Sequence, residues 1–364
     1  MNPKITVLVP TFNRANFLSE CLESLLNQSL PATQIIVVND GSEDHTLSVI
    51  KPYLNRIEYH ETNQLGKPSA INYGLKKVSG DYLWIFDDDD VALPNALIRF
   101  VEPLEKKPDY DFSFSTYFYT NSHEDTHKIG NVMGIQQIPD LTIRGPLIPL
   151  LEWNYLGGAA LFARTSIYDD VGNFDAELYR SQDYEMAIRI VRNFKGVQIE
   201  GDPTFHYRQH NELRGCKEER FKAEEKLKYW FKYDQIFFRK IYKDLPLEDY
   251  LPPGGNFEEK KRQALLQRIS IMASKLLITE VIKDLGLLAQ TENYIPFSQE
   301  EKTIIFKIII PPFYKLGSIL DSRIFLNEIE ELSASSKSIS LLKTEMTSVL
   351  NQIKKSEQLQ KNKS

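Results

Sequence analysis

The sequence predicts an α/β protein with a doubly wound, mainly parallel sheet, followed by a C-terminal α-helical extension. In the first third of the 364 residues, short runs of β-branched residues alternate with helical patterns. The run over 34–39 is apolar at its four central positions, as expected for a strand that is covered on both faces. The connections between the patterns are short, which favours parallel strands joined by helices.

Each element of this first third has its own signal. A strand is predicted over 5–9, where a β-rich run ends at Pro10. The helix that follows has one apolar face, formed by Phe17, Leu18, Cys21, Leu22, Leu25 and Leu26. A third strand is predicted over 57–60, a helix that begins with proline over 68–77, and a fourth strand over 82–86.

Acidic residues follow two of the predicted strands. Asp40 comes directly after the strand over 34–39, and four consecutive carboxylates, Asp87 to Asp90, follow the strand over 82–86. Parallel strands end at the same edge of a sheet, where open α/β sheets bind ligands, so Thr11 should lie in the same crevice. Four adjacent carboxylates repel one another unless a hard divalent cation supplies positive charge. The alternative interpretation is a solvated acidic turn that caps the next helix.

Composition and motifs argue against several classes of protein. The formal net charge of -6 gives no support for a nucleic-acid binder. The sequence contains neither a Gly-x-Gly-x-x-Gly motif nor a P-loop. Cys21 and Cys216 lie far apart, which argues against a disulfide framework and for a reducing compartment. Since neither a signal peptide nor an apolar run long enough for a membrane span is evident, a cytoplasmic location is expected.

Four segments of the first hundred residues occur in a recognisable order: 9–14 (Val-Pro-Thr-Phe-Asn-Arg), 38–42 (Val-Asn-Asp-Gly-Ser), 63–74 and 80–94. In this order and spacing they resemble family 2 glycosyltransferases, and the resemblance covers about residues 4–215. It implies the GT-A fold and an inverting enzyme that moves a sugar from a nucleotide diphosphate sugar, commonly a uridine diphosphate sugar. It also implies Mn²⁺ or Mg²⁺ as cofactor and a glycan or lipid-linked acceptor.

The resemblance assigns roles to residues of the donor site. Thr11 and Asp40 would contact the nucleotide base, Asp88 the ribose, and Asp87 and Asp89 would reach the metal ion.

One segment departs from the family pattern. Where members often carry Ala-Arg-Asn, this chain reads Ala70-Ile71-Asn72, and the nearest cation is Lys67. Lys67 is therefore assigned to the nucleotide, with an ordinary surface lysine at a helix start as the alternative.

The resemblance also assigns residues of the acceptor side. Gly157 and Gly158 precede an apolar strand, at a place where a ligand can approach the backbone closely. The resemblance implies that they lie beside the acceptor. Asp183, at the start of a predicted helix, would be the base that takes the proton of the acceptor hydroxyl. Gln182 stands before it where the family usually has glutamate, which removes one negative charge beside the base. The alternative is that Asp183 only caps its helix.

The segment over 205–210 resembles the strand end that closes the donor site in the family. His210 is predicted to complete the metal coordination, since imidazole suits Mn²⁺ better than Mg²⁺. Arg208, which would share a strand face with His210, and Arg214 in the next loop are predicted to contact the phosphates.

The remainder of the chain lies outside the resemblance. The predicted domains are a catalytic domain over 1–215, a helical extension over 216–333 and a polar tail over 334–364. Basic and aromatic residues alternate over 217–243, and 304–320 is apolar with paired prolines, so both could rest on an anionic membrane surface. The alternative is that both segments pack on the protein or form a dimer interface.

Two other functions remain open from the sequence. A nucleotidyltransferase also combines a nucleotide-binding sheet with acidic metal ligands, but it normally has an early glycine-rich basic loop that 10–14 lacks. Release of pyrophosphate from a nucleoside triphosphate would identify it. A non-catalytic sugar-nucleotide binding protein is suggested only by Gln182, and donor hydrolysis would exclude it.

Overall fold

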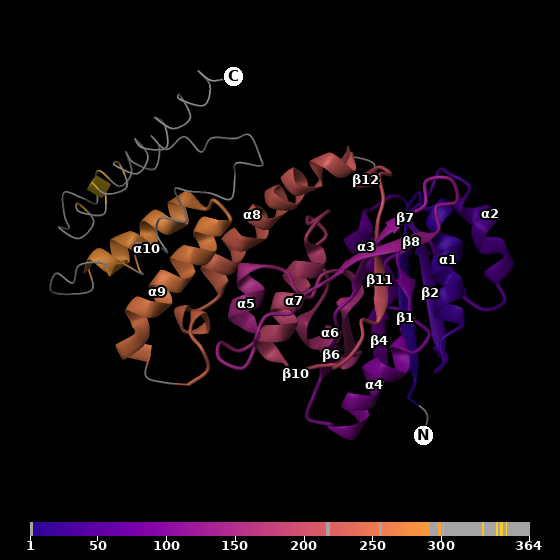
Figure 1. Cartoon of the computed structure of the whole chain (residues 1–364), viewed down its shortest axis with the longest axis horizontal. Helices are drawn as coiled ribbons and strands as arrows, with labels where there is room; N and C mark the ends of the chain where they lie inside the picture. Colours follow the sequence, from indigo (N-terminus) through magenta and orange to yellow (C-terminus); the bar gives the residue numbers. More distant parts are fainter. Residues whose placement is uncertain are drawn as a thin grey trace, which may run out of the picture. The chain divides into compact units, whose positions relative to one another are not determined.

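The computed structural model describes residues 3–215, 219–254 and 257–290, with isolated positions beyond 297. The residues form two compact units (Figure 1). The first contains Met1–Leu141 and Trp153–Tyr233, and the second Thr142–Glu152 and Asp234–Ser364. The boundary between the two units, after Tyr233, thus falls inside the helix Lys226–Asp244. The division into domains at 215 and 333 stays a prediction. The predicted α/β class is confirmed.

A seven-stranded sheet forms the centre of the first unit, in the order β10-β6-β9-β4-β1-β2-β3. All neighbours are parallel except β9, which runs antiparallel to both β4 and β6. The strands are β1 (Ile5–Thr11), β2 (Gln34–Asn39), β3 (Glu58–Glu61), β4 (Tyr82–Ile85), β6 (Phe112–Phe114), β9 (Leu161–Arg164) and β10 (Gly196–Gln198). Thr11, Asp40 and the acidic residues after β4 therefore meet at one edge, as predicted.

The helices of the first unit are α1 (Ala15–Leu26), α2 (Thr46–Ile50), α3 (Lys67–Leu75), α4 (Ala96–Lys106), α6 (Ser166–Val171), α7 (Gln182–Asn193) and the start of α8 (Lys226–Asp244). Single 3-10 turns are η1 (Lys51–Tyr53), η2 (Gly158–Ala160) and η3 (Ala223–Glu225).

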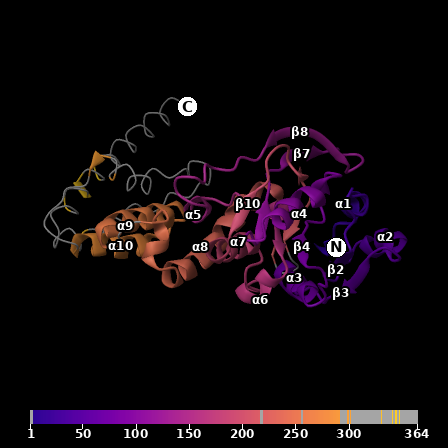
Figure 2. The ribbon, with the colours of Figure 1, turned by 90° about the horizontal axis from the view of Figure 1, so that it is seen from below.

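Both faces of the sheet are covered by helices, which explains why its central strands are apolar throughout. Val7 and Val9 of β1 belong to the core that includes Leu18 and Leu22 of α1. Leu8 points to the other face, where a Cβ on Gly74 of α3 would approach it to 2.4 Å. Figure 2 shows α1 and α4 on one side of these strands and α3 on the other. The sheet is thus doubly wound, as the sequence predicts.

A second sheet of four strands, in the order β5-β11-β7-β8, lies in the same unit. It contains β5 (Val91–Ala92), β11 (Phe205–Gln209), β7 (Phe118–Ser122) and β8 (Ile129–Ile135). The dense aromatic residues over 111–120 predict a single strand there. This prediction is wrong, because the chain leaves the large sheet after Phe114 and joins the small one at Phe118. Aromatic residues are frequent on both sides of this change, so composition alone does not reveal it.

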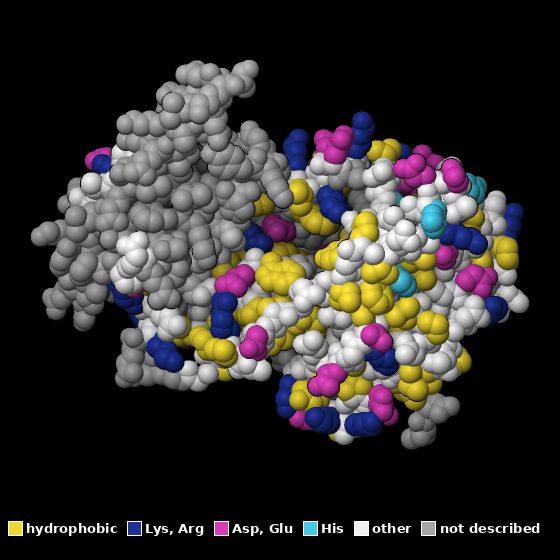
Figure 3. Space-filling view, in the orientation of Figure 1, with side chains coloured by type: hydrophobic (Ala, Val, Ile, Leu, Met, Phe, Trp, Pro, Cys, Tyr) yellow, Lys and Arg dark blue, Asp and Glu magenta, His cyan; other side chains and the backbone are white. Residues whose placement is uncertain are grey.

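The face of the molecule in Figure 3 mixes basic and acidic side chains, and hydrophobic side chains gather over the region of β7 and β8. Val132, Met133 and Ile135 of the edge strand β8 are among the exposed apolar residues. Exposed apolar side chains are ordinary on protein surfaces, so these residues by themselves do not identify a binding site.

The second unit is helical and contains a buried ion pair. Its elements are α5 (Leu147–Glu152), the end of α8, η4 (Leu247–Tyr250), α9 (Phe257–Ser274) and α10 (Ile278–Gln290). Arg268 of α9 donates from Nε and Nη2 to the two carboxylate oxygens of Asp284 of α10, over 2.8 and 2.5 Å. The hydroxyl of Tyr242 donates a third hydrogen bond to Asp284 at 3.0 Å.

The basic and aromatic segment over 217–243 predicts one helix, but helix α8 begins only at Lys226. Before it, 214–215 and 220–221 form a small two-stranded sheet, β12 with β13. The aromatic residues Tyr233, Phe237 and Phe238 of α8 are buried. This burial favours packing over insertion into a membrane surface for these side chains. No helix among the described residues is long and apolar enough to cross a membrane. The apolar segment over 304–320 lies outside the described residues.

Candidate active site

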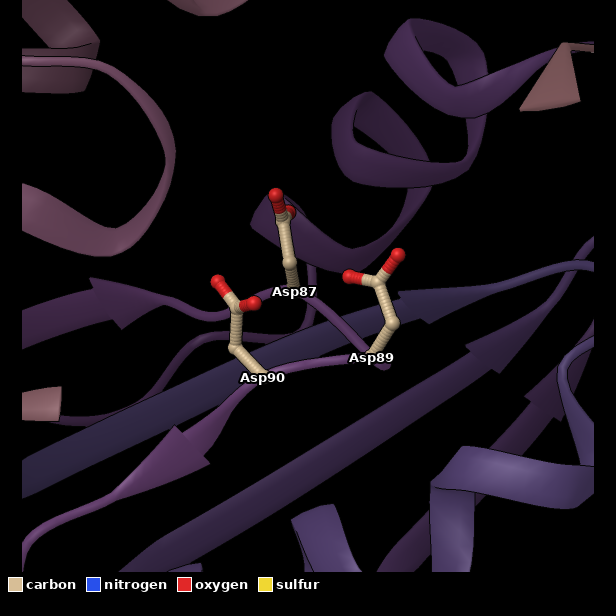
Figure 4. A group of neighbouring side chains, drawn as sticks. All are labelled: Asp87, Asp89 and Asp90. Carbon is tan, nitrogen blue, oxygen red and sulfur yellow. The ribbon is translucent and has the colours of Figure 1, made fainter. Parts of the chain in front are cut away.

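The acidic loop after β4 gathers three carboxylates into one cluster. Asp87, Asp89 and Asp90 each offer a carboxylate oxygen, and these oxygens lie within 4.8 Å of one another (Figure 4). Oxygen ligands at such spacing are those that Mg²⁺ and Mn²⁺ accept in proteins. The sequence assigns Asp87 and Asp89 to the metal ion and does not include Asp90, whose place in the cluster depends on how the turn folds back.

The carboxylates of this loop have two cations beside them, Arg14 at 3.8 Å from Asp89 and Lys67 at Asp87, but the pKa values of Asp88 and Asp90 are still raised. Burial, reinforced by the charge of Asp89, raises the pKa of Asp88 to about 7. Burial and the neighbouring carboxylates raise the pKa of Asp90 well above its usual range. Asp90 accepts a 2.9 Å hydrogen bond from the Arg208 backbone N–H, but its Oδ2 has no hydrogen-bond partner in the described part of the chain. Surplus negative charge in a buried site fits a divalent cation.

Lys67, at the start of α3, is the cation nearest to Asp87. Its Nζ donates to Asp87 Oδ1 at 2.5 Å, and its side chain is 34% exposed. Burial by itself lowers the pKa of Lys67, but Asp87, with smaller contributions from Asp183 and Asp89, raises it above the ordinary value. Lys67 is therefore a charged member of the acidic site rather than an isolated surface lysine, while its contact with the nucleotide stays a prediction.

Asp40 organises the loop that leads to Lys67. Its carboxylate accepts hydrogen bonds from the hydroxyl of Thr62 at 2.7 Å and from the backbone N–H groups of Leu65 and Gly66 at 2.8 and 2.7 Å. Gly66 has φ +86°, a conformation that favours glycine.

The buried hydroxyl of Thr11 has no hydrogen bond of ordinary geometry to any described residue, although it lies close enough to Asp88 to lower the pKa of that carboxyl.

His210, just after β11, lies beside the acidic loop as predicted. Its Nε2 is 3.0 Å from Asp89 Oδ2, and its Nδ1 accepts a hydrogen bond from the backbone N–H of Glu212 at 3.2 Å. A neutral imidazole has one N–H, so this pairing assigns the proton to Nε2, which donates to Asp89. Coordination of a metal ion through Nε2 would require the proton to move to Nδ1 and the contact with Glu212 to break.

Arg208 has a different position from the one predicted for a phosphate ligand. The residue is completely buried, and its guanidinium lies 5.0 Å from the Phe17 ring. Its three guanidinium nitrogens donate to the Asp89 carbonyl, the His127 carbonyl and the Glu20 carboxylate. The prediction of a direct phosphate contact is thus corrected: Arg208 fixes the backbone of the acidic loop. The alternation of side-chain directions along β11 correctly predicts the strand face of Arg208. It does not reveal that each guanidinium nitrogen donates a hydrogen bond to another group of the protein.

Arg214 begins β12, and its side chain lies outside the described residues. Its predicted role at the phosphates stays a prediction.

Asp183 is the second residue of α7 and faces the segment that carries Gly157 and Gly158. Its Oδ2 accepts a 3.0 Å hydrogen bond from the Gly158 backbone N–H. The N-cap of α7 is Ser181, which has φ +59° and makes no capping hydrogen bond through its side chain. The backbone contact across to Gly158 favours a positioned carboxylate over a simple helix cap.

The glycine segment connects Asp183 to the acidic loop. Gly158 has φ +61°, and a Cβ on it would lie 3.8 Å from Asp87 Oδ2. A Cβ on Gly157 would lie 3.9 Å from Asp183 Oδ2. The indole N–H of Trp84 in β4 donates to the carbonyl of Ala159 at 2.7 Å, which anchors the segment to the strand that delivers the acids. The predicted contact of both glycines with an acceptor stays a prediction.

A cavity of about 40 Å³ opens between these groups. Lys67, Asp87, Gly158 and Asp183 line it together with the buried Gln182 and apolar side chains of α3 and α7. Predicted residues of the donor half and the acceptor half thus border one space.

Known proteins resemble this chain in sequence and in fold. The profile of the family described as "Glycosyl transferase family 2" matches residues 6–170. An uncharacterised glycosyltransferase of Rickettsia typhi is 29% identical over 191 residues, which cover 52% of this chain and 59% of that protein. The chain spans less than two thirds of the length of the curated relatives it matches.

Two solved structures share the fold. TarS 1-349 of S. aureus in complex with UDP-GlcNAc has a TM-score of 0.56 at 16% identity, covering 96% of this chain and 92% of TarS 1-349. The mannosyltransferase PcManGT of Pyrobaculum calidifontis, in complex with GDP-Man and Mn²⁺, has a TM-score of 0.50 at 15% identity, covering 94% of this chain and 88% of PcManGT. The family match identifies residues 6–170, which include the acidic crevice at the sheet edge, as a glycosyl transferase family 2 domain, and the solved structures show that the chain has the GT-A fold.

Proposed function

We propose that this glycosyltransferase transfers a sugar from a uridine diphosphate sugar to a hydroxyl of a glycan or lipid-linked acceptor, with inversion at the anomeric carbon. The observation that carries the proposal is that the short segment with Gly158 lies between the carboxylate of Asp183 and the acidic cluster. Gly158 donates to Asp183 through its N–H, and a Cβ on Gly158 would lie 3.8 Å from Asp87 Oδ2. The sugar would lie between a carboxylate that takes a proton and an acidic cluster that receives the diphosphate.

Asp183 is assigned the role of general base. Its Oδ2 is held by the Gly158 N–H, and we assign proton acceptance to Oδ1. The acceptor oxygen forms a bond to the anomeric carbon, the bond from that carbon to the phosphate oxygen breaks, and the acceptor proton passes to Asp183. The nucleoside diphosphate leaves. Direct displacement by one nucleophile inverts the configuration.

Mn²⁺ or Mg²⁺ would be held by Asp87 and Asp89, with Asp90 as the further carboxylate of the cluster. When bound, the ion offsets the negative charge of the diphosphate. His210 supports Asp89 by a hydrogen bond, and its assignment as a direct ligand rests on the sequence alone. That PcManGT is described with GDP-Man and Mn²⁺ supports a metal ion at this edge of the fold.

The nucleotide would lie over the end of β1 and β2, against Thr11, Asp40 and Asp88, with Lys67 toward the diphosphate. The three hydrogen bonds that Asp40 accepts give it a second task, which is to hold the loop before Lys67. The complex of TarS with UDP-GlcNAc supports uridine diphosphate as the nucleotide part of the donor.

The first experiment is calorimetric titration of uridine diphosphate with and without Mn²⁺. We expect binding to need the ion, because the diphosphate and the acidic loop otherwise bring like charges together. Asp89→Asn should weaken both ligands. Equal affinity in the two conditions would contradict the metal assignment, and no binding in either would contradict the donor assignment.

Contact with an anionic membrane surface is proposed for the exposed basic residues of α8 only, since its buried aromatics are not available. Lys228, Lys232, Arg239 and Lys243 are exposed along this helix. Each basic residue near such a surface contributes about 1 kcal/mol, so binding should be reversible and weakened by salt. Co-sedimentation of the full chain with anionic and neutral vesicles at low and high salt tests it, and no binding to anionic vesicles at low salt would contradict it.

A further inference from the structure

The cavity beside α3 and α7 is lined by partly exposed polar residues, here called its mouth, and by buried apolar residues, here called its interior. Lys67, Asp87 and Asp183 line the mouth, where the proposed donor is held and attacked. Ile71, Phe174, Met186, Ala187 and Ile190 line the interior, and all five are at least 95% buried. A side group that leaves the sugar ring between Asp87 and Asp183 would enter this interior.

The size of the cavity limits that side group. A water-sized group needs about 10–15 Å³, so a cavity of about 40 Å³ holds roughly three such groups. A hydroxyl leaves most of this space as water against apolar walls, whereas an acetyl group, with its carbonyl carbon, oxygen and methyl, matches it.

Gln182 adds a directional requirement. The residue lines the cavity and is 4% exposed, and its Oε1 has no hydrogen-bond partner among the described residues. A buried carbonyl oxygen without a donor is unfavourable, so a ligand that brings an N–H or O–H group is favoured here. A deoxy-sugar methyl would fill the apolar space but leave this oxygen unpaired.

We propose that the cavity binds the acetamido group of an N-acetylhexosamine, so that the donor is a uridine diphosphate N-acetylhexosamine. The methyl group lies against the apolar interior, and the amide N–H donates to Oε1 of Gln182. This inference rests on the proposed function, because only a donor held between Asp87 and Asp183 places its sugar at the cavity mouth. The inference assigns Gln182 a role in sugar selection. The resemblance leads one to expect glutamate at this position. The glutamine amide carries no negative charge beside Asp183 and still provides an acceptor for the N–H of the sugar.

The test compares five ligands in the presence of Mn²⁺: uridine diphosphate alone, UDP-GlcNAc, UDP-GalNAc, UDP-glucose and UDP-galactose. We expect each acetamido sugar to bind about tenfold more tightly than its hydroxyl counterpart. Equal affinities across the four sugars, with uridine diphosphate bound, would overturn the inference alone. Failure of uridine diphosphate itself to bind would overturn the proposed function, and this inference with it.

Ala187→Leu fills the cavity from α7 and should reduce UDP-GlcNAc affinity to that of UDP-glucose without changing that of uridine diphosphate. Ala187→Ser is the matched control, because it keeps the cavity nearly open and should retain the preference. A preference that survives Ala187→Leu, in protein whose circular dichroism shows that it is folded, would place the acetamido group elsewhere and overturn the inference.

Gln182→Leu provides a second variant that does not depend on overpacking. It keeps the side-chain volume and removes the unpaired oxygen, so the fold should be maintained. The preference for UDP-GlcNAc over UDP-glucose should fall about fivefold, the effect of one lost neutral hydrogen bond. An unchanged ratio would show that Gln182 does not contact the amide. A different result would assign the cavity to the acceptor: the four donors bind equally, but turnover depends on whether the acceptor carries an N-acetyl group. That result would also overturn the inference.

Discussion

The two units of this protein each bury charged side chains, but they balance the charge differently. In the helical unit, Asp284 is fully buried and receives two hydrogen bonds from Arg268 and one from Tyr242. In the first unit, Asp87, Asp89 and Asp90 share a small space with Lys67 beside Asp87 and Arg14 beside Asp89, and an oxygen of Asp90 has no donor among the described residues. The helical unit pairs the charge of Asp284, whereas the first unit has more carboxylates than cations in its acidic cluster.

This difference separates a structural cluster from a binding site. In a buried ion pair, each charge is already balanced by its partner, so a ligand gains nothing by binding there. Loss of one partner lowers the free energy of unfolding. A surplus of one sign is costly in the free protein and becomes favourable only when a ligand of opposite charge arrives. Substitutions in the two clusters should therefore affect stability in one case and function in the other.

The largest effect is expected for Asp284→Ala in the helical unit. Removal of the carboxylate leaves the Arg268 guanidinium buried without its partner, which should lower the free energy of unfolding by about 3–5 kcal/mol. Urea denaturation followed by circular dichroism measures the loss. Glu248→Ala, at an exposed position of the same unit, serves as control and should change it by less than about 0.5 kcal/mol. Lost affinity for uridine diphosphate in folded Asp284→Ala would contradict the separation of roles.

Asp183→Asn should reduce turnover by about a hundredfold or more while the affinity for uridine diphosphate stays nearly unchanged, because the variant loses only the proton acceptor. Steady-state kinetics with the true acceptor and calorimetry with the nucleotide separate the two effects. Glu185→Gln is the control, since Glu185 lies in the same helical turn but is paired with Arg189. If Asp183→Asn kept wild-type turnover, the residue would serve only its helix.

The acidic loop should make the metal-free protein less stable as the pH rises. The pKa of Asp88 is raised to about 7 and that of Asp90 well above its usual range, so the folded state binds more protons than the unfolded state between these values and about 4. Stability is therefore fully present below about pH 4 and is lost as the pH approaches and passes 7. The Tm measured with EDTA should fall on the order of 5 °C over this range.

Added Mn²⁺ should remove most of that decrease, because the ion stabilises the ionised carboxylates. Asp90→Asn should also flatten the profile. A Tm that is independent of pH in EDTA, with the wild-type protein folded throughout, would show that the surplus charge is already neutralised within the protein.

The smallest effect is expected for Lys67→Met. In the free protein Lys67 and a metal ion both need Asp87, so removal of the ammonium should tighten Mn²⁺ binding without nucleotide by about tenfold, roughly 1.4 kcal/mol. With uridine diphosphate present the same variant should bind Mn²⁺ less tightly than wild type, because the diphosphate loses a cationic partner. Lys67→Arg is the control, since it keeps the positive charge, and its Mn²⁺ affinities with and without uridine diphosphate should rank as in the wild type. Equal changes in both conditions would exclude competition at Asp87.

Local patterns were sufficient for the strands that deliver the site. The apolar run over 34–39 and the run that ends at Asp87 both define strands with the predicted ends within a residue or so, since a strand covered on both faces has few alternatives. The start of α7 at Gln182 agrees with the segment in which Asp183 was expected.

Long-range contacts account for what the sequence did not predict. Arg208 is committed to Glu20, His127 and Asp89, residues that are 188, 81 and 119 positions away, so no motif around 205–210 reveals it. Asp90 is held by the backbone N–H of Arg208 in β11, and Oε1 of Gln182 has no partner among the described residues, neither of which the local sequence reveals. Residue type predicted which chemistry is present, and tertiary packing decided which groups are available for it.

The hydrogen bond between the Trp84 indole and Ala159 has an optical consequence. Trp84 is fully buried, three residues before Asp87, and is bonded to the segment that holds Asp183, whereas Trp153 is 41% exposed. Because the chain contains three tryptophans, Trp153→Phe and Trp230→Phe together leave one fluorophore at the junction of strand and glycine segment. Its emission, initially that of an indole in a dry environment, should change in intensity whenever the Gly158 backbone moves. Trp84 emission would therefore report the order in which the proposed metal ion, donor and acceptor bind.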